Sequence, residues 1–433
     1  MRVLLISNLF PPEVVGGAEI MVAALADGLL ELGCDVTVAA LAAKGAWRIE
    51  RPDGLTVEFL AAHPLGNDLL APSRVRWRRG AWYLLGEANL MARHRLGRLM
   101  DRLKPDIVHS SNVTGFGPQA MAAAAVRGLP LVHTTQDYGL ICVRGTMFRR
   151  GRPCTGQCTD CRVATTLRRV GSQAAHTVVG LSQAVLERHL ENGYFQSSQE
   201  QPIVRTWHLQ GRPQHPPLPA EAKGQELAPP VTFGYIGRLH TTKGVDRLIQ
   251  AMRRIAADGP MVGRVPAGRR ARLLIGGTGS PDLEAELKRQ AAGLPVEFLG
   301  WVQAESFYPM IDALVVPSLW HEPLGMVARE AHWWGRPVLA ARRGGLAEIV
   351  NDGRDGLLFD PDDVEEFAGA LGRFVQEPAL RRQLSEGARA VAPTDGRAGL
   401  AERYREIYRR AIERQRTERP AAAPEPLSEA TGP

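Results

Sequence analysis

Residues 313–341, ALVVPSLWHEPLGMVAREAHWWGRPVLAA, have the pattern of a strand, a loop, a helix and a second strand. The apolar runs at the two ends are short and β-rich, and the residues between them form a helix that starts near Leu324 or Gly325. In parallel sheets, ligands bind at the carboxyl ends of strands, where the first amides of a helix can bind an anion. We therefore expect the amides around Leu324, Gly325 and Met326 to face a phosphate.

Two glutamates, Glu322 and Glu330, lie on either side of the expected helix start. Glu330 is about one and a half turns into the helix, so both carboxylates can face the same cleft. Carboxylates suit hydrogen bonding to hydroxyl pairs, such as those of a sugar ring and a ribose. The alternative is a pair of solvated glutamates at an ordinary helix start.

The same alternation of strands and helices runs through the whole chain in two blocks. Strand patterns of the first block are at 3–7, 34–40, 55–60, 106–110, 130–135 and 177–182. Those of the second block are at 231–237, 271–277, 296–302, 313–318, 337–341 and 356–360. Such alternation predicts an α/β fold with two doubly wound, Rossmann-like domains.

The composition of the chain indicates where the domains end. A segment rich in proline and polar residues, 205–230, is expected to link an N-terminal domain (1–204) to a C-terminal domain (231–395). A helix is expected at 396–416, and the tail at 417–433 lacks apolar periodicity and is expected to be disordered. A length of 433 residues also favours two domains.

Composition and charge exclude some classes of protein. Hydrophobic residues make up 44% and charged residues 23%, as in ordinary globular proteins. The N-terminus resembles a strand rather than a signal peptide, and no uninterrupted apolar run is long enough to span a membrane, so we expect a cytoplasmic protein. The net charge of +7 fits a protein that binds a nucleic acid, an anionic membrane or a phosphorylated substrate, and charge alone does not distinguish these partners.

Two cations follow the first strand of the second block. Arg238 and Lys243, in GRLHTTKG, are placed where they can clamp a diphosphate, and the alternative is two exposed basic residues. A dinucleotide-dependent oxidoreductase is disfavoured because NLFPPEVVGGAE, after the first strand of the chain, lacks the G-x-G-x-x-G fingerprint.

Several stretches resemble a known enzyme family. GRLHTTKGVDRLIQAM, LLIGGTGSPDLEAEL, VEFLGWV, ALVVPSLWHEPLGMVAREAHWWGRPVLAARRGGLAEIVNDGRDGLLFDPDD and the N-terminal PPEVVGGAEIMVAALADGLLELGCDVTV are similar to glycosyltransferase family 4. The resemblance covers roughly residues 1–410. It implies the GT-B fold, with two Rossmann-like domains facing each other across a cleft, and transfer of a sugar from a nucleotide donor with retention of anomeric configuration.

The resemblance also implies roles for residues. Arg238 and Lys243 would bind the donor diphosphate, Glu322 the transferred sugar and Glu330 the ribose, and the RRGGLAE turn (Gly344, Gly345) would approach the donor. The expected catalytic set is Glu322, Arg238, Lys243, Gln136 and Asp137. The expected donor-binding set is Gly16, Gly17, Arg238, Lys243, Val302, Glu322, Leu324, Gly325, Met326 and Glu330.

Gly16 and Gly17 follow the first strand of the chain and precede a helix. Backbone amides at these positions can approach a donor phosphate, which a side chain would obstruct. The alternative is a tight turn with no ligand. The resembling family has a glycine pair at the donor, which favours the first interpretation.

The stretch PLVHTTQDYGLIC departs from the family's pattern. Similar enzymes have a histidine directly before the aspartate, where this chain has Gln136 before Asp137. Gln136 can form a hydrogen bond with a sugar but cannot carry a proton at neutral pH. His133 is expected to be buried and structural, and His109 and Asn112 are further candidates for the cleft.

Four of the five cysteines cluster in CVRGTMFRRGRPCTGQCTDC: Cys142, Cys154, Cys158 and Cys161. In a cytoplasmic protein such a group favours metal ligation over disulfides, and four thiolates suit a closed, structural zinc site. An iron–sulfur cluster and unliganded thiols are the alternatives. Some bacterial members of the resembling family carry a similar cysteine-rich insertion, here at 142–161. Cys34 is expected to pack as a small core residue.

The stretch 73–100, SRVRWRRGAWYLLGEANLMARHRLGRLM, places arginines beside tryptophans and a tyrosine. This mixture suits an anionic membrane surface or a lipid-diphosphate acceptor, and an ordinary solvated helix fits equally well. No nucleic-acid-binding motif accompanies it, so we expect no nucleic-acid partner.

The sequence thus predicts a retaining hexosyltransferase that moves a sugar from a UDP- or GDP-sugar to a glycan or lipid-linked acceptor in cell-surface polysaccharide biosynthesis. It is expected in the cytoplasm, with peripheral contact at the inner face of the membrane as an option. No catalytic metal is expected, because no DxD-type motif stands near the donor loops. The alternative is a protein that is stabilised by a bound metal, serves to bind a nucleotide sugar or as a scaffold, and has lost transfer activity.

Overall fold

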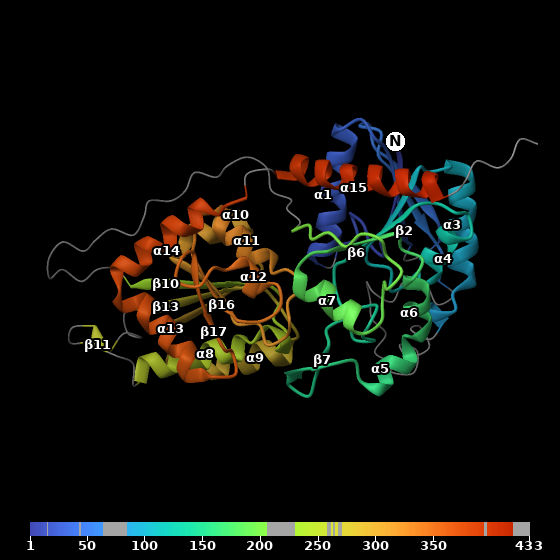
Figure 1. The fold of residues 1–433 in the computed structure, drawn as a ribbon. Coiled ribbons are helices and arrows are strands. Elements are labelled where there is room, and N and C mark those ends of the chain that lie inside the picture. Colours follow the sequence, from blue (N-terminus) through green and yellow to red (C-terminus); the bar gives the residue numbers. More distant parts are fainter. Residues whose placement is uncertain are drawn as a thin grey trace, which may run out of the picture.

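Two parallel sheets covered by helices organise the computed structural model of this chain (Figure 1). The structure describes residues 1–14, 16–42, 45–63, 85–205, 230–257, 261–262, 265–266, 271–393 and 396–418. The first sheet is built from the N-terminal half and the second from the C-terminal half. The predicted α/β architecture of two Rossmann-like halves is therefore confirmed.

The N-terminal sheet has the strand order β3-β4-β2-β1-β5-β6-β9. Its strands are β1 (Arg2–Ile6), β2 (Asp35–Leu41), β3 (Trp47–Glu50), β4 (Thr56–Leu60), β5 (Ile107–Ser110), β6 (Leu131–Thr135) and β9 (Thr177–Gly180). All pairs are parallel except β3 with β4. β3 was not predicted, because this edge strand is mostly exposed and lacks an apolar run.

Helices and one small hairpin complete the N-terminal half. They are α1 (Gly17–Glu31), α3 (Leu90–Leu103), α4 (Gln119–Ala125), α5 (Thr159–Ala164), α6 (Thr166–Ser172), α7 (Gln183–Glu191), and the hairpin of β7 (Phe148–Arg149) and β8 (Arg152–Pro153). α1 follows β1 directly and ends before Gly33, whose φ of 76° suits a glycine C-terminal to a helix. β1, α1 and β2 thus form a βαβ unit with parallel strands.

The second sheet has the order β14-β13-β10-β15-β16-β17 and is parallel throughout. Its strands are β10 (Val231–Ile236), β13 (Ala271–Gly276), β14 (Val296–Gly300), β15 (Ala313–Val316), β16 (Val338–Ala341) and β17 (Gly356–Phe359). Its helices are α8 (Val245–Ala257), α9 (Pro281–Gln290), α10 (Ala304–Phe307), α11 (Met326–Trp333), α12 (Leu346–Ile349), α13 (Val364–Gln376) and α14 (Pro378–Ala390). A short pair, β11 (Met261–Val262) and β12 (Val265–Pro266), lies apart from this sheet.

The last helix, α15 (Gly396–Glu418), returns to the N-terminal half and lies against α1 (Figure 1). A Cβ on Gly28 of α1 would come within 2.7 Å of the Ala401 side chain, so the glycine permits the close crossing. The helix predicted at 396–416 thus continues to Glu418. Most of the predicted linker (206–229) and tail (419–433), and residues 64–84, lie outside the described residues.

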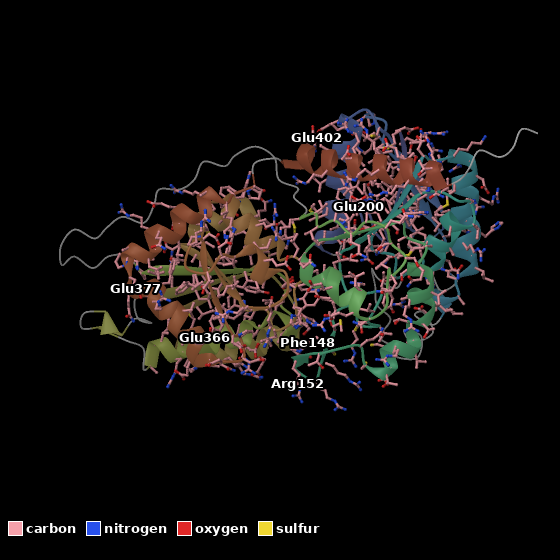
Figure 2. All side chains as sticks on the ribbon, in the orientation of Figure 1. Phe148, Arg152, Glu200, Glu366, Glu377 and Glu402 are labelled. Atoms are coloured by element: carbon pink, nitrogen blue, oxygen red, sulfur yellow. The ribbon has the colours of Figure 1, made fainter. Side chains whose placement is uncertain are left out.

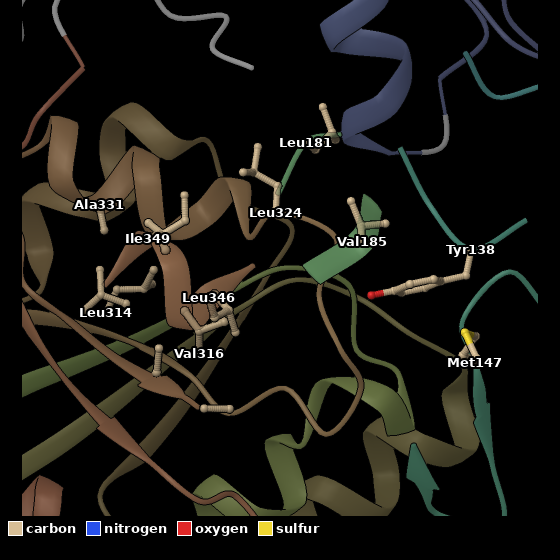
Figure 3. Close-up of a cluster of buried hydrophobic side chains, with 14 of the residues drawn as sticks. Tyr138, Met147, Leu181, Val185, Leu314, Val316, Leu324, Ala331, Leu346 and Ile349 are labelled. Atoms are coloured by element: carbon tan, nitrogen blue, oxygen red, sulfur yellow. The ribbon is translucent and has the colours of Figure 1, made fainter. Parts of the chain in front are cut away.

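Buried apolar residues also join the two halves. Leu181 and Val185 of the N-terminal half belong to the same buried cluster as Leu324, Leu346 and Ile349 of the C-terminal half (Figure 3). None of the helices in the described ranges combines the length and the hydropathy needed to span a bilayer.

Candidate functional site

A cavity of about 380 Å³ lies between the two halves. Its N-terminal wall consists of Gly17, Ala18, Ile20, Met21, Gln136, Asp137 and Leu181. Its C-terminal wall consists of Lys243, Trp320, Glu322, Pro323, Leu324, Gly325, Met326, Val327 and Glu330. Ligand sites of this size commonly lie between domains.

A buried ion pair occupies the C-terminal wall. The Nζ atom of Lys243 lies 2.6 Å from Oε1 of Glu322, and the Ser318 hydroxyl donates to the same oxygen at 2.6 Å. Glu322 is only 7% exposed. Burial alone would raise the pKa of the Glu322 carboxyl, but the charge of Lys243 and these hydrogen bonds hold that pKa below its usual value. The carboxylate is therefore kept ionised beside the cavity.

The helix start expected after β15 is present, one or two residues later than predicted. α11 begins at Met326, and Gly325 precedes it with a φ of 91°, a conformation that favours glycine. A Cβ on Gly325 would also come within 2.5 Å of Leu346. Leu324, Gly325 and Met326 all line the cavity, so the start of the helix borders it.

Gly344 and Gly345 have an internal role in this wall. A Cβ on Gly344 would lie 2.5 Å from the carbonyl oxygen of Glu322, and one on Gly345 would lie 2.7 Å from Cα of Leu324. The Gly345 amide donates to the Glu322 carbonyl at 2.7 Å. The turn thus approaches the loop that carries Glu322, and in the described structure it does not line the cavity.

Glu330 lines the cavity from the second turn of α11. The Tyr308 hydroxyl donates to its Oε2 at 3.0 Å. Burial raises the pKa of the Glu330 carboxyl despite this hydrogen bond. Glu322 and Glu330 therefore line one cavity, the position that the sequence predicted for both. Their electrostatic surroundings differ.

Gln136 and Asp137 lie on the opposite wall, directly after β6. The amide oxygen of Gln136 is shielded from solvent and finds no hydrogen-bond partner among the described residues. Asp137 accepts from the Gly139 amide at 2.6 Å, and burial raises the pKa of its carboxyl. The Gln136 amide oxygen beside the cavity is therefore available to accept a hydrogen bond from a ligand.

Three expected donor residues do not line the cavity. Arg238 is exposed on the loop after β10, Gly16 caps α1, and Val302 packs near Gly276 after β14. A Cβ on Gly16 or Gly17 would meet no protein atom closer than 3.8 Å. The packing of the chain alone does not require this glycine pair.

The three remaining polar candidates, in or directly after β5 and β6, do not line the cavity. His109 was expected as a cleft candidate, but it is buried between Tyr408, whose hydroxyl lies 2.6 Å from Nδ1, and Thr134. Burial lowers the pKa of His109 to about 3. His133 is buried against Phe195, as predicted, and Asn112 pairs with Asn8.

The two halves are joined by polar contacts next to the cavity. The Glu348 carboxylate of α12 accepts from the amides of Gln183 at 2.9 Å and Ala184 at 2.8 Å, in the first turn of α7. The Ser182 hydroxyl donates to the Pro323 carbonyl at 2.5 Å. These contacts fix the Glu322 loop against the N-terminal half.

In the structure, the four cysteines are not arranged as the expected zinc site. Cys158 and Cys161 share a hydrogen bond, and Cys142 and Cys154 are near enough to affect the electrostatics of the cluster. Within the described part of the chain, no three His, Cys, Asp or Glu side chains are placed to hold a metal ion. Cys34 is buried in the core, as predicted.

Sequence reasoning missed the apolar part of the cavity. The residues that it did not anticipate are Ala18, Ile20, Met21, Leu181, Trp320, Pro323 and Val327. Trp320 stands two positions before Glu322, and Ala18, Ile20 and Met21 follow the glycine pair, so nearness to a predicted residue was the available signal.

Two family models match consecutive parts of the chain. "Glycosyltransferase Family 4" matches residues 15–197, and "Glycosyl transferases group 1" matches residues 230–377. The boundary between the matches falls between the two sheets.

Curated relatives include an uncharacterized 42.6 kDa protein in the cps region of Klebsiella pneumoniae, 25% identical over 81% of this chain and 87% of that protein. The D-inositol 3-phosphate glycosyltransferase of Streptosporangium roseum is 32% identical over 40% of this chain. This match spans only 41% of that enzyme.

Solved structures share the fold. The sucrose-phosphate synthase of Thermosynechococcus elongatus has a TM-score of 0.71 at 21% identity, covering 95% of this chain and 99% of that one. HepE of Anabaena, solved with UDP-glucose, has a TM-score of 0.64 at 19% identity over 95% and 100% of the two chains. The outer core galactosyltransferase WaaB has a TM-score of 0.58 at 15% identity over 96% and 99%. The family matches and the two-sheet architecture together identify the chain as a glycosyltransferase with the GT-B fold.

Proposed function

We propose that this enzyme transfers a hexose from a nucleotide-diphosphate sugar to a glycan or lipid-linked acceptor, with retention of anomeric configuration. The observation that carries the proposal is the cavity between the halves, where the Lys243–Glu322 ion pair lies beside the start of α11 and faces Gln136 and Asp137. Such a site offers a cation and free amides for a diphosphate, and carboxylates for hydroxyl groups.

The donor is proposed to lie along the C-terminal wall. Its diphosphate would contact Lys243, the amides at the start of α11 and, from the neighbouring loop, Arg238. The transferred sugar would contact Glu322, and the ribose would contact Glu330. Lys243 then exchanges its Glu322 partner for the incoming phosphate, and the negative charge that develops on the leaving group is stabilised where it forms.

The transfer step breaks the bond between the anomeric carbon and the diphosphate oxygen. The acceptor hydroxyl oxygen bonds to the same face of that carbon, and its proton passes to the departing phosphate oxygen. This route needs no histidine base, so Gln136 is compatible with it. Gln136 and Asp137 would form hydrogen bonds with the sugar from the N-terminal wall.

The solved structures of similar fold support the donor class. Those of HepE contain UDP or UDP-glucose, and that of starch synthase IV contains ADP. A UDP- or GDP-sugar is the expected donor. The name of WaaB places its acceptor in the outer core of lipopolysaccharide, which supports a role in cell-surface polysaccharide biosynthesis. We place the enzyme in the cytoplasm.

The cysteine cluster is proposed as a structural zinc site that forms when metal is present. Cys142, Cys154, Cys158 and Cys161 come from one local segment, and four thiolates suit a closed, tetrahedral zinc site. No transfer step involves this metal, because four protein ligands leave no open position.

The test is donor hydrolysis followed by transfer. Purified enzyme is incubated with UDP-, GDP- and ADP-glucose and galactose, and release of the nucleoside diphosphate is measured with and without simple glycoside acceptors. One donor should be hydrolysed above background, and the product should keep the anomeric configuration of the donor. Binding of a donor with no hydrolysis would favour the nucleotide-sugar-binding scaffold instead.

A further inference from the structure

An exposed apolar stripe runs along α5 and α6. The side chains of Cys161, Thr165, Arg168 and Ser172 are buried at helical spacing and form the inner face. On the outer face, Val163 is 72% exposed, Leu167 47% and Val170 65%. Leu167 and Val170 are three residues apart on α6 and share one face, and Val163 lies near the end of α5.

Positive charge surrounds this stripe. Residues 142–172 contain seven arginines and one acidic residue, Asp160. Arg149 pairs with Asp160 at 3.4 Å, whereas Arg150, Arg152 and Arg162 are exposed. Figure 2 shows Arg152 at the outer edge of the β7–β8 hairpin. The net charge of this segment exceeds half of the +7 of the whole chain.

A buried ion pair anchors the inner face of α6 to the segment just before α3. Arg168 on the inner face of α6 pairs with Glu87, which lies just before α3. Leu85, Leu90 and Met91, around the start of α3, are 44%, 67% and 41% exposed. The segment that carries Glu87 thus also has exposed apolar side chains.

We propose that this α5–α6 surface, defined by Val163, Leu167 and Val170 with the arginines at 150, 152 and 162, docks on an anionic lipid bilayer. Aliphatic side chains that protrude between arginines can enter the acyl boundary while the guanidinium groups remain at the headgroups. Opposite charge on the lipid matches the nearly uncompensated arginines. The inference extends the proposed function, since it brings the N-terminal half to a membrane that carries a lipid-linked acceptor.

The experiment is co-sedimentation of the full chain with vesicles of phosphatidylcholine, with and without phosphatidylglycerol. The wild type should bind only the anionic vesicles, and added salt should release it. The triple variant Val163→Ser, Leu167→Ser, Val170→Ser should bind about tenfold more weakly, because three apolar side chains leave the bilayer. Arg150→Gln with Arg152→Gln and Arg162→Gln should lose the preference for phosphatidylglycerol.

The matched control is Met310→Ser, which removes an apolar side chain that is 47% exposed on the other half. Its vesicle binding should equal that of the wild type. Equal binding to neutral and anionic vesicles, or unchanged binding of both variants, would overturn the proposal. Donor hydrolysis measured without vesicles separates the two inferences: its absence counts against the proposed function alone, whereas the vesicle results decide the docking surface.

Discussion

Replacing Lys243 with methionine should destabilise the enzyme and abolish most of its turnover. The variant keeps the apolar stem but leaves the Glu322 carboxylate, 7% exposed, without the ammonium group 2.6 Å away. Removing one partner of a buried pair costs about 3 to 5 kcal/mol. Ser318 still donates to the same oxygen and the cavity lies beside it, so we expect a loss near the lower end, about 3 kcal/mol.

Changing both partners should separate stability from function. Lys243→Met combined with Glu322→Gln removes both charges, so most of the lost stability should return while turnover stays low. Urea unfolding at neutral pH and donor hydrolysis measure the two quantities. A stability loss in the double variant equal to the sum of the losses in Lys243→Met and Glu322→Gln would refute the coupling of the pair. Normal turnover in the double variant would refute its function.

The pH dependence of this loss follows from the pKa of Glu322. Its folded pKa is lowered, so the pair contributes stability that is present above the unfolded value of 4.5 and is lost as the pH falls through the folded value. The stability difference between wild type and Lys243→Met should therefore shrink in acid. A difference that is constant from neutral pH to acid would contradict the ion-pair interpretation.

Three further changes test neighbouring parts of the account. Glu330→Gln should weaken nucleotide binding, measured by calorimetry, by about 1 to 3 kcal/mol; because burial raises the pKa of Glu330, this variant should also gain stability over the wild type as the pH rises above 4.5. Gln136→Leu should lower turnover but leave stability within about 1 kcal/mol, since its amide oxygen has no partner to lose among the described residues. Metal analysis of enzyme purified without chelator should find about one zinc per chain.

Each of these has a contrary outcome. Unchanged nucleotide affinity in Glu330→Gln would exclude the ribose contact. Full activity in Gln136→Leu would place the sugar elsewhere. Absence of metal while Cys142, Cys154, Cys158 and Cys161 all react freely with a thiol reagent would show that the cluster holds no zinc.

Much of the fold was predictable because the strands of a covered parallel sheet are buried on both faces and therefore consist mostly of apolar residues. Runs such as VLLI and ALVV are apolar throughout, and the structure places strands there within one or two residues of the predicted bounds. β3 escaped notice because an exposed edge strand has no such signature. The fold of each half therefore follows from local pattern.

The site was only partly predictable, for a geometric reason. Strand ends and helix starts indicated Glu322, Gly325 and Glu330, since these lie on one wall formed by consecutive residues. The apolar residues of the opposite wall, such as Met21 and Leu181, depend on how the halves meet, which no local pattern encodes. His109 was misjudged for the same reason, because its partner Tyr408 lies 299 residues away.

The most direct test of the central claim is a thermal-shift panel with UDP, GDP, ADP and NAD, each at saturating concentration. A ligand at about a hundred times its dissociation constant adds about 2.7 kcal/mol to the stability of the state that binds it. The account predicts a selective shift with UDP or GDP in the wild type, and a much smaller shift in Lys243→Met. A shift with NAD alone, or with none of the four, would contradict a nucleotide-sugar site between the two halves.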